Sequence, residues 1–173
     1  MTAPKYLMLE PGGGERLRFL DNSLLVIKTA GESGADLAYY EYIAEPAAKG
    51  SAQHIHHAHD ETFYVVDGHF EFALGAKTVA AEPGSFLLVR RGQPHGFRNK
   101  GDSRGRIVGT FSPRFAQYFR ELAGIIERTG AAPNPKDWIE LYGRYDTIFY
   151  DGAASGSSGS APGSAVKRSA GTS

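Results

Sequence analysis

The chain has 173 residues, and its 19 basic and 19 acidic side chains balance to a formal net charge of zero. A neutral chain lacks the long-range positive field with which nucleic acids and anionic membranes are recognised, so we expect neither as a partner. Cysteine is absent, which excludes a disulfide framework, a thiol nucleophile and a cysteine-based zinc site.

The first part of the chain, residues 1–111, has the pattern of an all-β domain. Its β-branched and aromatic residues form short runs that Gly, Asp, Asn and Pro separate. Asp67-Gly68 stands between two such runs and predicts a tight hairpin turn, and further turns are expected at 75–77 and 82–84. Short strands at this spacing predict an antiparallel barrel. The clearest strand candidates are 24–29, 37–45, 61–66, 69–74, 85–89, 95–99 and 106–111.

The pattern changes to a helical one in residues 112–151. Ser112 precedes Pro113, and Gly130 stands where a helix would stop, so a helix is expected between them. Asn134 and Pro135 repeat these signals for a second helix. We expect both helices to pack on the outside of the barrel or to close one end of it. Residues 152–173 are rich in Gly, Ser and Ala and are expected to form a flexible tail.

Four of the six histidines lie within the stretch from Gln53 to Thr62. His54 and His56 are two residues apart, so a strand would place both imidazoles on one face, where they suit a divalent transition metal. After a turn, either Asp60 or Glu61 would add a carboxylate oxygen. His95 begins a later strand. In a barrel, strands that are distant in sequence face one interior, so His95 would complete a candidate metal shell of three histidines and one carboxylate.

Two blocks around these residues resemble the motifs of the cupins. The first block is His54-Ile55-His56, four residues, Glu61, six residues and Gly68. The second block places Gly84, Gly92, His95 and Asn99 at the spacing of the second cupin motif. The chain departs from these motifs in two places: Arg90 replaces a proline, and Gly50 is only four residues before His54.

The resemblance implies a cupin barrel with His54, His56, Glu61 and His95 as ligands of one divalent metal ion. Three imidazoles and one carboxylate can bind Fe, Mn, Ni, Co, Cu or Zn. A single cupin followed by two helices is also similar to bacterial proteins of the quercetin 2,3-dioxygenase type. That similarity implies dioxygen chemistry on an enolic aromatic, flavonol-like or polyketide-like small molecule. Glu61 would be the catalytic base, if the apolar cavity raises its pKa.

Other functions fit the same shell. A metal held in this way also serves oxygen-independent isomerases, cyclases and decarboxylases as a Lewis acid, and a cupin can bind a small molecule without turnover. We expect a cytoplasmic protein, because no apolar run approaches the ~20 residues of a membrane span and the N-terminus lacks the apolar segment of a signal peptide. A homodimer is expected by analogy, with residues 4–10 as a strand that pairs with the second subunit.

The remaining candidates are expected to have structural roles. We expect His57 and His59 to be solvated turn residues, although either would also suit a place beside the metal shell. We also expect His69 to be exposed, Arg90 and Arg91 to lie at the pocket rim, and Asn99 to bind backbone groups. Apolar residues of the strands are expected in the core, with a pocket lining as the alternative; these are Phe63, Val65, Phe70, Phe72, Phe86, Leu88 and Phe97. Tyr39, Tyr40 and Tyr42 are expected on a covered sheet surface, with substrate stacking as the alternative.

Overall fold

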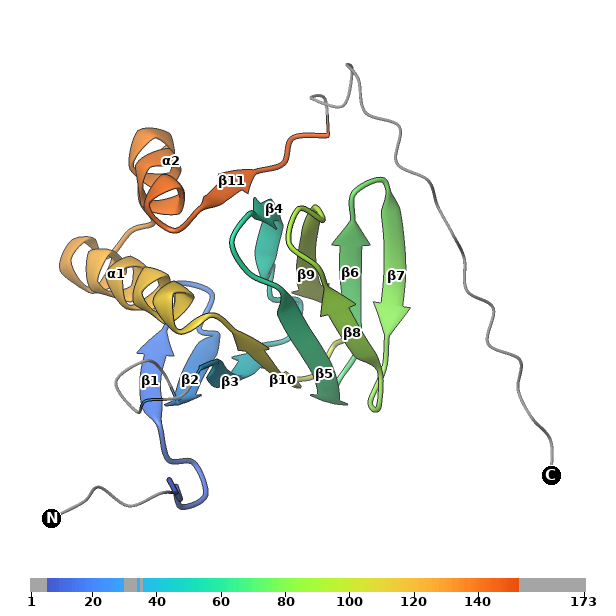
Figure 1. The fold of residues 1–173 in the computed structure, drawn as a ribbon. Helices are drawn as coiled ribbons and strands as arrows, with labels where there is room; N and C mark the ends of the chain where they lie inside the picture. Colours follow the sequence, from blue (N-terminus) through green and yellow to red (C-terminus); the bar gives the residue numbers. More distant parts are fainter. Residues whose placement is uncertain (1–5, 30–33, 35, 153–173) are drawn as a thin grey trace, which may run out of the picture.

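The computed structural model describes residues 6–29, 34 and 36–152, and Figure 1 shows their arrangement. Within them the chain forms two antiparallel sheets and two helices. The strands are β1 (Glu15–Arg18), β2 (Leu24–Thr29), β3 (Ala38–Ala44), β4 (Ser51–His56), β5 (Glu61–Asp67), β6 (Phe70–Leu74), β7 (Lys77–Ala81), β8 (Phe86–Val89), β9 (His95–Asn99), β10 (Gly105–Phe111) and β11 (Thr147–Phe149). The helices are α1 (Pro113–Thr129) and α2 (Pro135–Arg144).

The two sheets face each other as a jelly roll, which is the cupin fold that the sequence predicts. One sheet has the strand order β1-β2-β3-β10-β5-β8, and the other has the order β11-β4-β9-β6-β7. The core between them is rich in phenylalanine. The ring centroids of Phe63 and Phe72 are 5.1 Å apart, and Phe97 lies 5.6 Å from Phe63 and 5.7 Å from Phe72.

The prediction of a hairpin at Asp67-Gly68 is wrong. β5 lies between β10 and β8, so both of its edges are occupied, and β6 pairs with β7 and β9 in the other sheet. The chain therefore crosses from one sheet to the other at Gly68. A Cβ atom on Gly68 would lie 2.5 Å from the Cα of Gly105, so this crossing needs glycine for the close approach as well as for its φ of 83°. The turn after Leu74 does form a hairpin, between β6 and β7.

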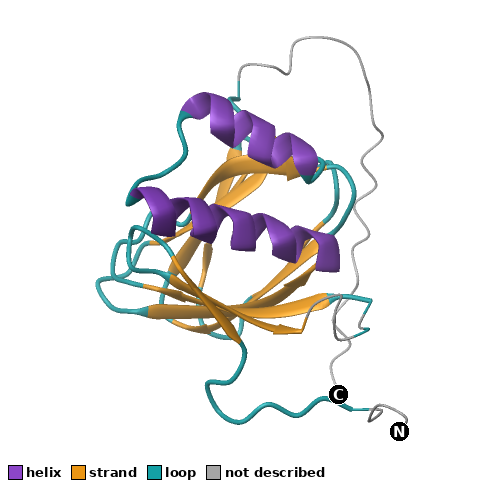
Figure 2. Ribbon diagram, turned by 90° about the vertical axis from the view of Figure 1, so that its left-hand side faces the viewer, coloured by secondary structure: helices purple, strands orange, loops and turns teal. Residues whose placement is uncertain are grey.

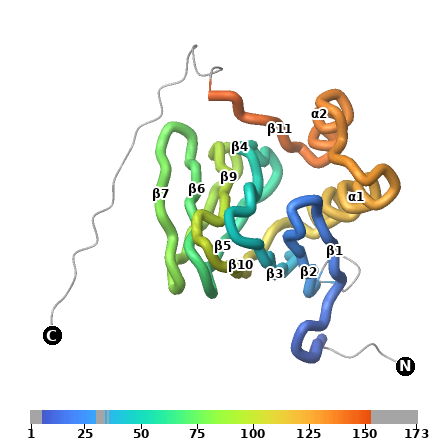
Figure 3. Tube along the Cα trace, turned by 180° about the vertical axis from the view of Figure 1, so that it is seen from behind, coloured from blue at the N-terminus to red at the C-terminus, as the bar shows by residue number. Residues whose placement is uncertain are grey.

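α1 begins and ends where the sequence predicts, and α2 begins where it predicts, but residues 147–149 of the expected helical segment form β11. The Ser112 side chain accepts a hydrogen bond from the backbone N–H of Phe115, and Asn134 caps α2 in the same way through Asp137. Gly130 ends α1 with a left-handed φ of 67°. Figure 2 shows the helices side by side over the strands, and Figures 1 and 3 place them on the side of the molecule opposite β6 and β7.

Two of the expected core residues lie on the surface instead. Phe86 is 65% exposed and Leu88 is 46% exposed, because β8 turns the alternate residues Leu87 and Val89 inward. A shift of one residue in register exchanges the two faces of a strand, and a short apolar run does not reveal which face is buried. Residues 6–10 form no strand in the structure, and their expected pairing with a second subunit stays a prediction.

No helix among the described residues is both long and apolar enough to cross a membrane. The expected flexible tail spans residues 152–173, and all of it except Gly152 lies outside the described part of the chain.

Candidate metal centre

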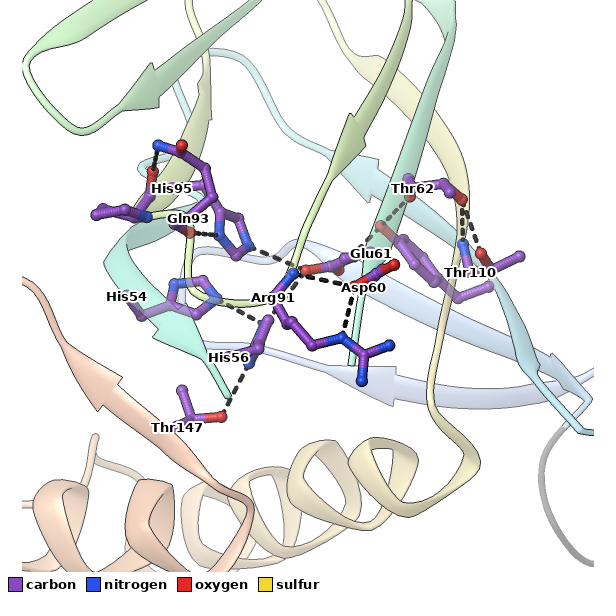
Figure 4. Close-up of polar contacts among 12 residues, drawn as sticks. His54, His56, Asp60, Glu61, Thr62, Arg91, Gln93, His95, Thr110 and Thr147 are labelled. Carbon is purple, nitrogen blue, oxygen red and sulfur yellow. Dashed lines mark hydrogen bonds and ion pairs between the residues drawn. The ribbon is translucent and has the colours of Figure 1, made fainter. Parts of the chain in front are cut away.

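Three strands bring the four candidate ligands together. β4 carries His54 and His56 on one face, β5 begins with Glu61, and β9 begins with His95. Residues 57–60 form the turn that lets Glu61 face the imidazoles, as the sequence requires. All four side chains are buried, and one possible ligand atom from each lies within 4.8 Å of the others. Figure 4 shows them pointing toward one another.

Asp60, the alternative carboxylate, points elsewhere. Its Oδ1 accepts hydrogen bonds of 3.0 Å from both the backbone N–H and the Nε of Arg91. Arg90 and Arg91 are exposed, as expected for residues of a rim. The structure therefore leaves Glu61 as the carboxylate that faces the imidazoles.

The hydrogen bonds of the imidazoles fix which ring nitrogen faces the centre. The Nδ1 of His54 lies 2.8 Å from the carbonyl oxygen of Ala52, and the Nδ1 of His95 lies 3.0 Å from that of Gln93. A carbonyl oxygen only accepts, so each Nδ1 carries the hydrogen. In the neutral rings the Nε2 atoms then offer lone pairs to the centre.

These lone pairs meet at short range. The Nε2 atoms of His54 and His56 are 3.1 Å apart, and the Glu61 Oε2 lies 3.1 Å from the Nε2 of His95 and 3.3 Å from that of His56. Nitrogen lone pairs and a carboxylate repel one another unless a cation lies among them. Three imidazoles and a carboxylate are also donor types that divalent transition metals accept, so the residues fit a metal ion.

The electrostatics of the metal-free protein support this arrangement. Burial, together with the neighbouring His56 and His95, lowers the pKa of His54 to about 3, so His54 is neutral at pH 7 and suited to bind a metal. Burial alone would raise the pKa of Glu61, but its contacts with His56 and His95 outweigh burial and lower it. The expectation of a raised pKa for Glu61 is therefore wrong, because that expectation considered the apolar cavity and not the imidazoles.

A large cavity opens beside the centre. Its volume is about 710 Å³, and His54 and Glu61 form part of its wall. The sheets and the helices both contribute aromatic rings to the lining, which include Tyr40, Tyr42, Phe63, Phe97, Phe115, Tyr118, Trp138 and Tyr142. Pockets of this size that combine apolar walls with a few polar groups are typical small-molecule sites.

The tyrosines differ from the sequence expectation. Tyr40 and Tyr42 are buried and line the cavity, whereas only Tyr39 is substantially exposed. The Tyr40 hydroxyl lies 3.3 Å from both the Oε1 of Glu61 and the carbonyl oxygen of Thr62, and it shares its hydrogen between these two acceptors. Sequence reasoning missed this contact, although the alternation of residues along β3 places Tyr40 and Tyr42 on the same inward face.

The other histidines divide into exposed and buried ones. His57 and His69 are exposed, as expected. His59 is 8% exposed, and its ring stacks 4.3 Å from that of His56, so the interpretation as a solvated residue is wrong. Its Nε2 has no hydrogen-bond partner among the described residues. Phe115 from α1 covers His59, with 4.9 Å between the ring centroids. The sequence of the turn does not predict this burial, because the helix that covers His59 lies more than 50 residues later in the chain.

Asn99, which ends β9, has the structural role that the sequence predicts. Its side-chain amide donates to the carbonyl oxygens of Glu45 at 2.9 Å and Ser103 at 2.8 Å. It therefore ties two loops together away from the candidate ligands.

Comparison with known proteins agrees with this fold. Residues 40–111 match the family model described as a cupin domain. The chain is 26% identical over 91 residues to the tetracenomycin polyketide synthase protein TcmJ of Streptomyces glaucescens, a match that covers 53% of this chain and 61% of that protein. The matched region thus spans about three fifths of the length of that relative.

Solved structures show the same architecture. The polyketide cyclase RemF from Streptomyces resistomycificus superposes with a TM-score of 0.55 at 18% identity, over 62% of this chain and 80% of that one. A sugar phosphate isomerase from a cupin superfamily, from Silicibacter pomeroyi, superposes with a TM-score of 0.54 at 20% identity, over 61% of this chain and 75% of that one. These solved structures share the fold of this chain, and the cupin-domain model matches residues 40–111 of it.

Proposed function

We propose that this cupin-fold chain is a metal-dependent enzyme that acts on an enolisable aromatic, polyketide-like small molecule. The observation that carries the proposal is the position of His54 and Glu61 in the wall of a cavity lined with aromatic rings. A flat aromatic substrate would stack among these rings with an oxygen atom directed at the four buried donors.

In this proposal, metal binding, proton transfer and exclusion of water fall to different residues. His54, His56, Glu61 and His95 would hold the metal, which when bound supplies a Lewis acid for an enolic oxygen. Glu61 stays ionised at neutral pH, because its pKa is lowered, and its carboxylate would accept a proton from the substrate. Tyr40 holds the Oε1 of Glu61 in place. The aromatic walls exclude water from the reacting atoms.

The reaction that we propose is ring closure or isomerisation without dioxygen. The relative from Streptomyces glaucescens is a polyketide synthase protein, which supports a polyketide-like substrate. Enolisation transfers a proton from the polyketide chain to Glu61 and makes a carbon nucleophile. This carbon closes the ring by adding to a carbonyl carbon of the same chain; the π bond of that carbonyl breaks, and its oxygen takes the proton back from Glu61. No external oxidant is needed.

A dioxygenase that acts on the same kind of enol is the second candidate. His54, His56, Glu61 and His95 would hold a metal ion that supplies either Lewis-acid or dioxygen chemistry. The donor set is therefore also compatible with the dioxygen chemistry that the resemblance to quercetin 2,3-dioxygenase-like proteins implies. Both candidates require the same metal and the same cavity, so one experiment can separate them.

The experiment starts with elemental analysis of the purified protein and a screen of enolic aromatics under argon and in air. We expect about one divalent metal ion per chain and turnover under argon. Turnover only in air, with consumption of dioxygen, would establish the second candidate instead. Binding of the aromatics without turnover in either atmosphere would make the chain a non-catalytic binding protein.

His56→Ala tests the metal centre itself. We expect the variant to lose both the metal and the turnover, because one of four ligands is removed, while its circular dichroism spectrum remains that of the folded protein. His69→Ala, at an exposed histidine, is the matched control and should retain both. Wild-type turnover by metal-free His56→Ala would contradict the proposal.

A further inference from the structure

The three imidazoles of the candidate centre are oriented in two different ways. His54 and His95 each donate from Nδ1 to a carbonyl oxygen two residues earlier in the chain, at Ala52 and Gln93. These acceptors belong to the backbone, so no side-chain substitution removes them. His56 has no such carbonyl, and its Nδ1 lies 2.9 Å from the Oγ1 of Thr147.

The hydrogen bonds of Thr147 define the direction of this contact. The hydroxyl of Thr147 donates its single hydrogen to the carbonyl oxygen of Tyr145, at 3.0 Å. Its Oγ1 must therefore accept from His56, so the hydrogen of the neutral imidazole is on Nδ1 and the lone pair is on Nε2. Thr147 is only 1% exposed, so water does not compete for either bond.

The strand pairing explains why the contact forms. β11 pairs antiparallel with β4 at the edge of its sheet, and Thr147 lies directly opposite His56 in the register. Side chains directly opposite one another in an antiparallel pair share a face and lie close together. Figure 4 shows Thr147 reaching His56 from the C-terminal strand. Thr147 lies beyond residues 40–111, which match the cupin domain, so this support comes from outside the matched region.

We propose that Thr147 is a positioning residue that holds His56 with Nε2 toward the metal and thereby sets the metal affinity of the centre. This inference rests on the proposed function only in taking His56 as a ligand. Groups that orient a metal-binding histidine through its other nitrogen typically change metal affinity by 10–100-fold when they are removed. Among the three, His56 is the imidazole whose Nδ1 contacts a side chain and not a backbone carbonyl.

The test compares Thr147→Val, which has nearly the same shape without the hydroxyl, with Thr147→Ser, which keeps it. Cobalt(II) affinity is measured by competition with a chelator. We expect roughly 10–100-fold weaker binding for Thr147→Val and recovery in Thr147→Ser. Thr110→Val is the matched control, because Thr110 also makes a hydroxyl hydrogen bond on a strand, with Thr62 at 2.8 Å, and touches no imidazole. Equal affinities for wild type and Thr147→Val would overturn the proposal.

A second measurement separates orientation from general destabilisation. Nitrogen-15 NMR of the metal-free protein at neutral pH reports which nitrogen of His56 carries the hydrogen. We expect hydrogen on Nδ1 in wild type and Thr147→Ser, and a mixture of both tautomers in Thr147→Val. An unchanged tautomer in Thr147→Val would also overturn the proposal. If wild type bound no cobalt, the proposed function would fail, and the NMR result would still decide whether Thr147 orients His56.

Discussion

At the scale of single residues, the Tyr40 hydroxyl joins the candidate centre to β3, which lies in the same sheet as Glu61. Its ring stacks on Phe111 with a centroid distance of 4.7 Å and an interplanar angle of 14°, while its oxygen reaches Glu61. Burial raises the pKa of Tyr40 well above its ordinary value, and the charge of Glu61 raises it further, so this hydroxyl remains a donor at any physiological pH.

Tyr40→Phe removes this hydrogen bond and keeps the aromatic stack. We expect the free energy of unfolding of the metal-free protein to fall by about 1–2 kcal/mol, because one oxygen of a buried carboxylate loses its donor. Urea denaturation of the metal-free protein measures this change. Tyr39→Phe, on the exposed face of the same strand, should change the same quantity by no more than about 0.5 kcal/mol. Similar losses in both variants would contradict a special role for Tyr40.

The sequence predicts the candidate ligands better than the groups that support them. His54, His56, Glu61 and His95 stand out because their types and spacing have a chemical meaning within two short blocks. Thr147 has no such signal, because it lies 91 residues from His56 and threonine is an ordinary strand residue. Contacts of this kind depend on strand order, which no local pattern encodes.

At the scale of elements, α1 forms a wall of the cavity as well as a cover for the sheets. Phe115, Tyr118 and Leu122 are buried, and all three line the cavity. Phe111 and Phe119 contact at a centroid distance of 5.3 Å and fix the start of the helix against β10. The helix therefore contributes to the size of the space that a substrate can occupy.

Leu122→Trp tests this role, because an indole at this position would occupy part of the cavity. We expect KM for an enolic aromatic substrate to rise tenfold or more, equivalent to about 1.4 kcal/mol of binding, with an unchanged metal content. Steady-state kinetics and elemental analysis measure the two quantities. Glu127→Trp, on the exposed side of the same helix, is the control and should leave KM unchanged. A wild-type KM in Leu122→Trp would show that the substrate does not use this cavity.

The helices were more predictable than the connections between strands. Ser112, Pro113 and Gly130 act within a few residues of one another, so the local sequence contains the complete signal for α1. The pairing of β5 depends instead on β10, which begins some 40 residues later and takes one of its edges. The Asp67-Gly68 pair is consistent with a hairpin or with a crossing between sheets, and the tertiary structure decides between them.

At the scale of the whole molecule, several buried tyrosines make the fold sensitive to alkaline pH. Burial raises the pKa of Tyr42 to about 12, and burial also raises those of Tyr40 and Tyr118 well above their ordinary values. In the unfolded chain these groups lose their protons near pH ~10. Above that pH the unfolded state binds fewer protons than the folded state, so the free energy of unfolding decreases as the pH rises.

Tyr42→Phe should reduce this loss. Each such group contributes a slope of about 1.4 kcal/mol per pH unit between the pKa of the unfolded chain and that of the folded protein. We expect the free energy of unfolding of wild type to fall more steeply than that of Tyr42→Phe between about pH 10 and pH 12. Urea denaturation at several pH values measures both slopes. Parallel slopes would mean that the hydroxyl of Tyr42 ionises as easily in the folded protein as in the unfolded chain.

The pairing of β11 with β4 also has a consequence for biosynthesis. A chain that grows on the ribosome exposes His54, His56, Glu61 and His95 well before it exposes Thr147, because proteins are made from the N-terminus. Until residues 145–149 emerge, His56 lacks the acceptor that holds its ring. On the role proposed for Thr147, a nascent chain that stalls before residues 145–149 emerge would bind a metal ion with less than full affinity.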